Sequence, residues 1–299
     1  MGMEYLSLFE PPSSALLAAV ARKLGLGPQR LHEALHPQED YLLVSPHSPI
    51  FVVADGVTLE RDPAGQYPYP SGAGVVARIF CEETVKHSEA CYPHFTQESV
   101  PQIFRAANHA VGAYNTAQGR TKASSNFWDF DLFAATGAFV ILQGGTAYWA
   151  AIADAFVLQL SEEGAVKFHS PGPWGNVEAH LPANWRELPA DRRMRLLRSR
   201  YRNGVNEQGE LIGYGVITGE ETAGRYLHYG TLALAEGDFL AVCTDGFEPY
   251  MHLPEFIALL TRGGEGLGLR VKQFTAAKGQ EDPEQFGQER SLILIAVSR

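Results

Sequence analysis

Apolar residues recur at helical spacing in the first third of the chain. Residues 1–36 are expected to form a helical N-terminal extension, because Leu16, Leu17 and Val20 follow a Ser-Ser pair that can cap a helix. Two long helices are expected at 72–90 and 99–116, where apolar side chains return every three or four positions. Each of these helices therefore has an apolar face that requires a partner.

Extended segments surround the two long helices. Short alternating or apolar runs, bounded by Gly, Pro and Ser turns, predict strands. Connections as short as Gln143–Gly145 make neighbouring strands antiparallel, so we expect a β-meander over 133–169. The other expected elements are a hairpin at 41–44 and 50–54, strands at 226–234, 239–243 and 291–297, and a helix near 254–262. This order predicts a single α+β domain spanning residues 1–299, with a largely antiparallel sheet core.

Composition and charge narrow the functional class. The 299 residues are 45% hydrophobic and 19% charged, and 24 Lys and Arg against 34 Asp and Glu give a net charge of −10. This acidity argues against nucleic-acid or membrane partners, because both reward clustered positive charge. The three cysteines have no metal-site spacing, and we expect neither a signal sequence nor a transmembrane helix, so a cytoplasmic location is the expectation.

Acidic residues stand where apolar strands begin or end. Glu39–Asp40 precedes one predicted strand, Asp55–Gly56 follows another, and Asp245–Gly246 follows a third. A strand end holds a carboxylate rigidly, and Mg²⁺ or Mn²⁺ prefers carboxylate, carbonyl and water oxygens. Asp-Gly is also a common turn, so the three points together, and none of them alone, indicate a divalent metal site.

Several motifs in order resemble the PP2C-type (PPM) metal-dependent protein phosphatases. The resemblance covers about 38–297 and rests on Gln38–Asp40, Val52–Val57, Ala135–Ala138, Ala151–Phe156, Gly237–Phe247 and Ser291–Ile295. It implies a four-layer αββα sandwich of two antiparallel sheets flanked by helices. By position, residues 170–225 resemble the flap-like insertion that overhangs the active site of this family.

The resemblance also implies a site and an activity. It makes Asp55 and Asp40 catalytic residues, with Asp55 bridging two Mn²⁺ or Mg²⁺ ions and Asp40 orienting a bound water molecule. The other residues expected at the metal ions are Glu39, Gly56, Asp245, Gln288 and, at an optional third ion, Asp154. The implied protein is a metal-dependent phosphoserine/phosphothreonine protein phosphatase that uses metal-activated water, with a phosphorylated protein as substrate.

Two departures from the family pattern keep an alternative open. Gln288 stands where the family has a metal-binding Asp, and Glu289, one residue along, could take its place only if the last strand begins with a bulge. Leu35 and His36 occupy the region of the family's phosphate-binding Arg. The alternative is a weak or inactive PP2C-like pseudophosphatase that binds a regulatory protein partner, and a phosphatase for a small metabolite is a third interpretation. The basic run Arg192–Arg202 is interpreted as a solvated helix face, with phosphate binding or a partner surface as alternatives.

Overall fold

Two five-stranded antiparallel sheets form the centre of the molecule in a computed structural model, which describes residues 2–23, 38–57, 70–127 and 130–298. One sheet, called sheet A, has the order β1 (Gly2–Glu10), β10 (Arg290–Ser298), β9 (Phe239–Cys243), β6 (Phe156–Leu160) and β7 (Val166–His169). The other, sheet B, has the order β2 (Tyr41–Val44), β3 (Ile50–Gly56), β4 (Ala135–Gln143), β5 (Thr146–Ile152) and β8 (His228–Ala233).

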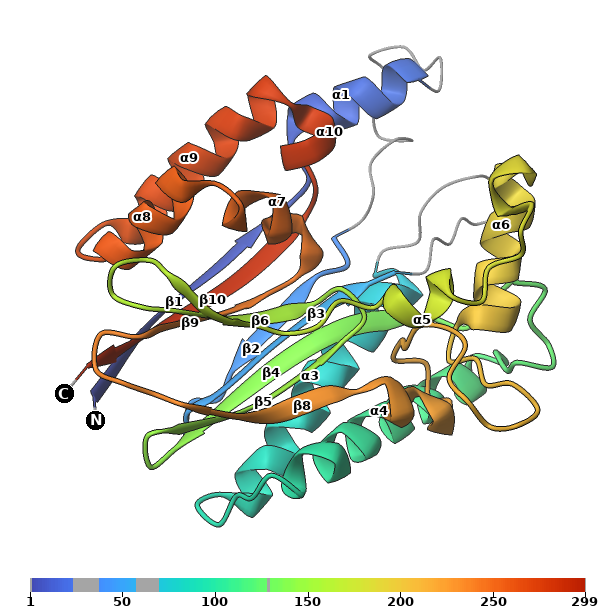
Figure 1. The fold of residues 1–299 in the computed structure, drawn as a ribbon, viewed down its shortest axis with the longest axis horizontal. Coiled ribbons are helices and arrows are strands. Elements are labelled where there is room, and N and C mark those ends of the chain that lie inside the picture. Colours follow the sequence, from blue (N-terminus) through green and yellow to red (C-terminus); the bar gives the residue numbers. More distant parts are fainter. Residues whose placement is uncertain (1, 24–37, 58–69, 128–129, 299) are drawn as a thin grey trace.

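Helices cover the outer face of each sheet (Figure 1). Sheet B packs against α3 (Gly72–Cys91) and α4 (Ser99–Ala117), whose apolar faces share a core with it. Sheet A is covered by α7 (Glu248–Met251), α8 (Pro254–Arg262) and α9 (Leu267–Glu281), with α1 (Ser14–Lys23) and α10 (Pro283–Phe286) beside α9. The expected four-layer αββα sandwich is therefore confirmed.

The strands are apolar on both faces because both faces are buried. In β3, Phe51 and Val53 belong to the core between the sheets, whereas Val52 and Ala54 belong to the core under α3 and α4. This alternation follows from the two-residue period of a strand. It fixes the register of β3, since a shift by one residue would exchange the two faces. The hairpin β2–β3 and the two long helices are also confirmed.

The expected meander over 133–169 is wrong, although the four strands exist. β4 pairs with β5 in sheet B, and β6 pairs with β7 in sheet A, so the chain crosses between the sheets after Ile152. Ala153 has a positive φ of 62°, a conformation that turns the chain away from a continuing hairpin. Asp154 consequently lies at the crossing between the two sheets.

The N-terminal segment differs from the expected helical extension. Gly2–Glu10 form strand β1 at the edge of sheet A, antiparallel to β10. The helix predicted from residue 13 is present as α1, and the Ser13 hydroxyl accepts the Leu16 N–H at 3.1 Å. The rest of the predicted extension, residues 24–36, lies outside the described residues. The long helix α9 was not predicted.

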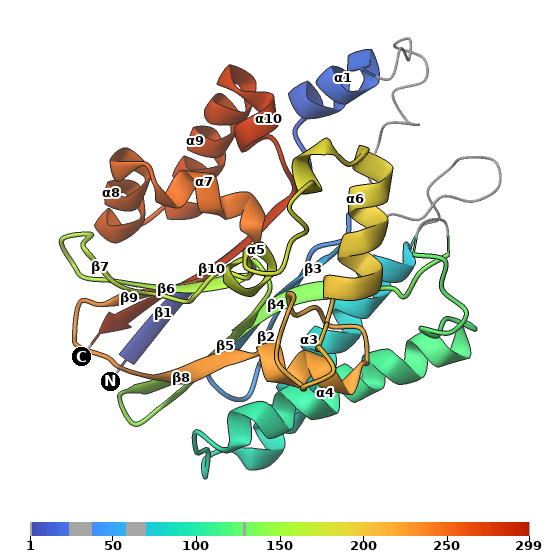
Figure 2. The ribbon, with the colours of Figure 1, turned by 45° about the vertical axis from the view of Figure 1, so that its right-hand side comes forward.

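Residues 170–225 are mostly irregular, as expected, with short helices. These are α5 (Gly175–Glu178), α6 (Ala190–Leu196), a π-helix at Leu197–Tyr201 and 3₁₀ helices at Trp185–Glu187 and Glu221–Tyr226. Figures 1 and 2 both place α5 and α6 at the same end of the two sheets. Across the described ranges, no helix has the length and apolar character needed to cross a bilayer.

Candidate functional site

The end of β3 brings the first two acidic pairs together. The Gly56 N–H donates to the Glu39 carbonyl at 3.2 Å, so Glu39–Asp40 lies directly beside Asp55–Gly56. Glu39 and Asp40 are buried, and Asp55 is partly buried at the position of β3 that pairs with Thr136 of β4. The strand geometry of sheet B therefore determines where these carboxylates lie.

Thr244, at the end of β9, connects sheet A to this acidic group. Its hydroxyl donates to Asp40 Oδ2 at 2.8 Å, and the same hydroxyl oxygen accepts the Ser291 N–H at 2.8 Å. The Thr244 N–H donates in turn to the Ser291 carbonyl at 3.1 Å. Asp245 follows directly in a 3₁₀ turn, Asp245–Phe247. The ends of β9 and β10 are thus held against Asp40 by buried hydrogen bonds.

Glu289, which precedes β10, completes the acidic group. Its Oε1 accepts the backbone N–H groups of both Glu39 and Asp40 at 2.8 Å. Gln288, the residue expected at a metal ion, is exposed, and its carbonyl accepts Arg290 Nη1 at 2.8 Å. The sequence offered Glu289 as a substitute for the missing Asp only through a bulge at the start of the last strand. The contact between Glu289 and Asp40 has no local signal in the sequence, because the two residues are 249 positions apart.

Close backbone packing explains the glycine of each Asp-Gly pair. A Cβ on Gly56 would lie 2.7 Å from the Ala73 carbonyl carbon in the first turn of α3. A Cβ on Gly246 would lie 2.0 Å from the Glu289 carbonyl oxygen. Both distances are too short for a side chain. The two glycines therefore let the strand ends approach α3 and the segment before β10, which brings the carboxylates together.

Burial and mutual repulsion raise the pKa values of the clustered carboxyl groups. Burial, followed by the charges of Asp40, Asp245, Asp154 and Glu289, raises the pKa of Asp55 well above its ordinary value. Burial also raises the pKa of Asp40 to about 6, that of Asp245 to about 7 and that of Glu289 to about 8. These groups cannot all be ionised together at neutral pH unless a positive charge lies among them.

Asp154 lies at the crossing between the sheets and contributes to the same electrostatic field. Its charge raises the pKa of Asp245 and of Asp55, after burial, and burial raises its own pKa. Its Oδ1 atom is buried and accepts no hydrogen bond from the described residues. An unsatisfied buried carboxylate oxygen is costly unless a ligand or cation occupies the space beside it.

The structure thus brings together Asp40, Asp55, Asp154 and Asp245, with Glu39 beside them. Within the described part of the chain, no three His, Cys, Asp or Glu side chains are already spaced to ligate one ion. The donor set nevertheless suits a hard divalent cation, because it consists of carboxylates and carries excess negative charge. The charge argument and the orphaned oxygen of Asp154 support cation binding.

The basic run of the flap-like segment divides into buried and exposed residues. Arg202 is buried and makes two hydrogen bonds, of 2.8 and 2.9 Å, to the Asp131 carboxylate. Arg198 Nη1 lies 4.0 Å from the same carboxylate, and Arg200 is exposed. The interpretation as a solvated face is therefore wrong for Arg202, which joins the segment to the loop before β4.

Tyr214 places this segment near the acidic group. Its ring packs on Trp174, with centroids 5.6 Å apart. Burial raises the pKa of Tyr214 to about 12, and the charges of Arg202, Arg198, Asp131 and Asp154 all act on it. A single tyrosine is thus within electrostatic reach of both the Arg202–Asp131 pair and Asp154.

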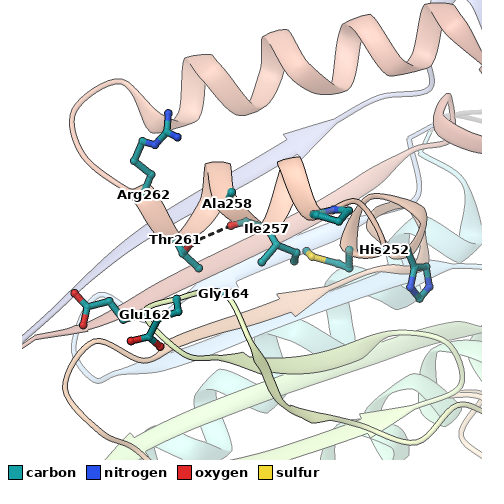
Figure 3. A pocket seen from close by; sticks show the side chains of 10 residues that line it. Glu162, Gly164, His252, Ile257, Ala258, Thr261 and Arg262 are labelled. Atoms are coloured by element: carbon teal, nitrogen blue, oxygen red, sulfur yellow. Dashed lines mark hydrogen bonds between the residues drawn. The ribbon is translucent and has the colours of Figure 1, made fainter.

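A separate pocket lies beside α8, between this helix and the β6–β7 turn (Figure 3). It has a volume of about 570 Å³ and is lined by Glu162, Gly164, His252 and Arg262, among others. The Thr261 hydroxyl, drawn in the same view, donates to the Ile257 carbonyl at 3.2 Å. β6 runs from the residues next to Asp154 to this turn, so the pocket is distinct from the acidic group.

Comparison with known proteins supports the same architecture. No family model matches the chain, and no curated protein matches its sequence. The serine/threonine phosphatase PstP of Mycobacterium tuberculosis superposes with a TM-score of 0.62 at 10% identity, over 99% of each chain. The PstP catalytic domain in complex with two manganese ions gives 0.60 at 13% identity, again over 99% of each chain. PppA of Pseudomonas aeruginosa gives 0.60 at 12% identity, over 99% of this chain and 98% of the other.

These similarities confirm the fold implied by the motifs. PP2C-type serine/threonine phosphatases are the structural neighbours of this chain over nearly its whole length. The chain therefore has the PP2C fold, at a sequence identity that assigns architecture alone. Its acidic group lies at the strand ends that carry the motifs resembling those of PP2C-type phosphatases.

Proposed function

We propose that this protein is a metal-dependent phosphoserine/phosphothreonine protein phosphatase of the PP2C type, acting in the cytoplasm. The observation that carries the proposal is the meeting of Asp40, Asp55, Asp245 and Glu289 at the ends of two different sheets. Burial raises the pKa values of all four above their ordinary range. The fold, shared with a phosphatase solved with two manganese ions, supports the same function.

The residues proposed to hold Mn²⁺ or Mg²⁺ are carboxylates and one backbone carbonyl. Asp55 would serve two ions, and the further proposed ligands are Glu39, Asp245, the Gly56 carbonyl and, at a third ion, Asp154. Glu289 replaces the expected Gln288, whose side chain is exposed. The chemistry that such ions supply is activation of water for attack on phosphorus and neutralisation of phosphate charge. Asp40, held by Thr244, would orient the water through its second oxygen.

Glu289 favours an active enzyme over the pseudophosphatase. This chain lacks the carboxylate that the family pattern has at position 288, but Glu289 supplies a carboxyl group that interacts electrostatically with Asp55 and Asp40. The alternative, a partner-binding module of weak activity, is supported by Gln288 itself and by the lack of a preformed ligand trio among the described residues. The phosphate-binding region at Leu35 and His36 lies outside the described residues.

Hydrolysis assays distinguish the two functions. We expect p-nitrophenyl phosphate and a phosphothreonine peptide to be hydrolysed as Mn²⁺ is titrated, and EDTA to abolish both activities. Asp55→Asn and Asp245→Asn should lose turnover and manganese binding, the latter measured by calorimetry. Arg192→Gln, an exposed substitution on α6, serves as a matched control. A folded wild-type protein that binds no manganese and hydrolyses neither substrate would overturn the proposed phosphatase and favour the partner-binding alternative.

A further inference from the structure

A small cavity of about 240 Å³ lies next to the acidic group. Ala153, which directly precedes Asp154, forms part of its lining. The remaining walls come from residues 172–176 around the start of α5, from 211–215 and from 225–228 at the start of β8. Figures 1 and 2 show α5 beside the ends of the sheets, where the chain crosses from β5 to β6. The cavity is thus built from the flap-like segment and sheet B together.

The walls of this cavity are fixed by hydrogen bonds before any ligand arrives. The buried Tyr226 hydroxyl donates to the Gly204 carbonyl and accepts the Gly213 N–H at 2.9 Å. Arg225 Nη2 donates to the Gly209 carbonyl at 2.7 Å. A preformed wall loses little conformational freedom on binding, which favours recognition of a ligand.

The lining has a charge opposite to that of the protein as a whole. The exposed Arg225 gives the lining its positive charge, and the lining residues that the structure describes include no Asp or Glu. His228 also lines the cavity, but burial lowers its pKa and favours the neutral imidazole. The chain as a whole carries a net charge of −10. This positively charged cavity is one residue away from Asp154, which is proposed to hold a metal ion. It therefore favours an anionic group on the substrate molecule that also carries the phosphate.

From this arrangement we propose that the cavity is a specificity site for an acidic residue of the phosphoprotein substrate, close in sequence to the phosphorylated residue. Arg225 would bind the acidic side chain through its guanidinium, and His228 would line the site beside it. This inference rests on the proposed phosphatase function. Because the cavity lies at one fixed place beside Asp154, it should favour an acidic residue at one fixed position of the peptide relative to the phosphorylated residue.

Two glycines allow the cavity to be filled without a steric clash. A Cβ at Gly172 or Gly175 would meet no atom within 4 Å, and neither glycine has a positive φ. Because Gly172 lines the cavity, Gly172→Phe should place a bulky ring at its wall while the fold is retained. Gly224→Phe is the matched control, because Gly224 is outside the lining and a Cβ there would have its nearest atom 4.0 Å away.

The test is a set of phosphothreonine peptides in which a single Glu is moved through the three positions on each side. We expect the wild type to prefer Glu at one position by about tenfold in kcat/KM over the same peptide with Gln. Arg225→Gln and Gly172→Phe should lose this preference, whereas Arg225→Lys should keep most of it. Hydrolysis of p-nitrophenyl phosphate, which has no peptide, should be the same in all of these proteins.

The outcomes separate this inference from the proposed function. Turnover of p-nitrophenyl phosphate with equal kcat/KM for every peptide would overturn the specificity site and leave the phosphatase intact. If nothing is hydrolysed, fluorescence anisotropy of the labelled peptides still tests the cavity. Binding of the preferred Glu peptide that is weakened by Gly172→Phe and not by Gly224→Phe supports the site, and equal binding by both variants overturns it.

Discussion

The hydroxyl of Thr244 donates a hydrogen bond of 2.8 Å to Asp40 Oδ2 and thereby joins the end of sheet A to the segment before sheet B. Both residues are buried, so water cannot replace the bond if it is removed. Asp40 is the residue proposed to orient water at the site. The bond therefore contributes both to stability and to the position of a functional carboxylate.

Thr244→Val should destabilise the protein and weaken its activity. The substitution preserves shape but leaves an oxygen of buried Asp40 and the Ser291 N–H without the threonine hydroxyl, which costs about 1–3 kcal/mol. Urea unfolding measures the loss, and kcat for p-nitrophenyl phosphate should fall with it. Thr244→Ser, which keeps the hydroxyl, is the control. Equal stability of the Val and Ser variants would show that the bond contributes nothing.

Glu289→Gln should weaken manganese binding more than any change at Gln288. The Gln side chain can still accept the Glu39 and Asp40 N–H groups, so the substitution removes charge and keeps the contacts. We expect the Kd for Mn²⁺, measured by calorimetry, to rise about tenfold, which corresponds to about 1.4 kcal/mol.

The exposed neighbour provides the control for that experiment. Gln288→Ala should change the Kd by less than about twofold, a difference below 0.5 kcal/mol on the same scale. The reverse result, in which Gln288→Ala raises the Kd and Glu289→Gln does not, would show that Gln288 is the metal ligand, as the family pattern indicates.

Gly246→Ala should destabilise the end of β9. The added Cβ would lie 2.0 Å from the Glu289 carbonyl oxygen, so the backbone before β10 must move. Overpacking of this kind costs about 1–3 kcal/mol, and displacement of Glu289 should also weaken manganese binding. Thermal unfolding with and without Mn²⁺ measures both effects. Gly224→Ala, with its nearest atom 4.0 Å away, should leave both unchanged.

The Arg202–Asp131 pair should make stability depend on acid pH. Burial opposes ionisation of Asp131, but the hydrogen bonds and charge of Arg202 outweigh it and lower the pKa of this carboxyl in the folded protein. A lowered folded pKa means that the pair stabilises the fold above the ordinary pKa of Asp. This contribution is lost as the pH falls through the lowered value.

Comparison of Asp131→Asn with the wild type measures this contribution. At pH 7 the substitution leaves Arg202 buried beside a neutral amide and should cost about 3 kcal/mol in urea unfolding. The difference should shrink as the pH falls toward about 2. Asp191→Asn, an exposed substitution on α6, should have no effect. A difference of constant size over this whole range would contradict the role of the ion pair.

Local patterns were sufficient for the elements that carry the acidic motifs. β3 begins at Ile50 as predicted and continues past the predicted end at Ala54 to Gly56, and α3 and α4 lie where the helical spacing placed them. The places of the carboxylates at strand ends indicated a shared site. Their arrangement in it could be predicted only through the family resemblance, because Asp40 and Thr244 are 204 residues apart in the chain. Periodicity describes a face of one element and carries no information about its partner.

The errors arose where tertiary contacts override local signals. β1 pairs with β10, which lies at the other end of the sequence, so no hairpin turn between them indicates the pairing. The connection from β5 to β6 is as short as a hairpin loop, so its length predicts that the two strands pair. Instead, the positive φ of Ala153 turns the chain, and β6 joins the other sheet. The sequence named Glu289 only as a possible substitute for Gln288, because its contact with the backbone N–H groups of Glu39 and Asp40 depends on tertiary structure.

The crossing at Ala153–Ala155 has a thermodynamic consequence. Asp55 belongs to sheet B, Asp245 follows sheet A, and Asp154 lies on the chain between them. Cations held by carboxylates from both sheets would bind only when the two sheets are docked, so their binding free energy would add to the free energy of sheet docking. Linkage is reciprocal. Loosening the inter-sheet core at Val53 or Val242, far from solvent, should therefore appear first as a weaker affinity for manganese.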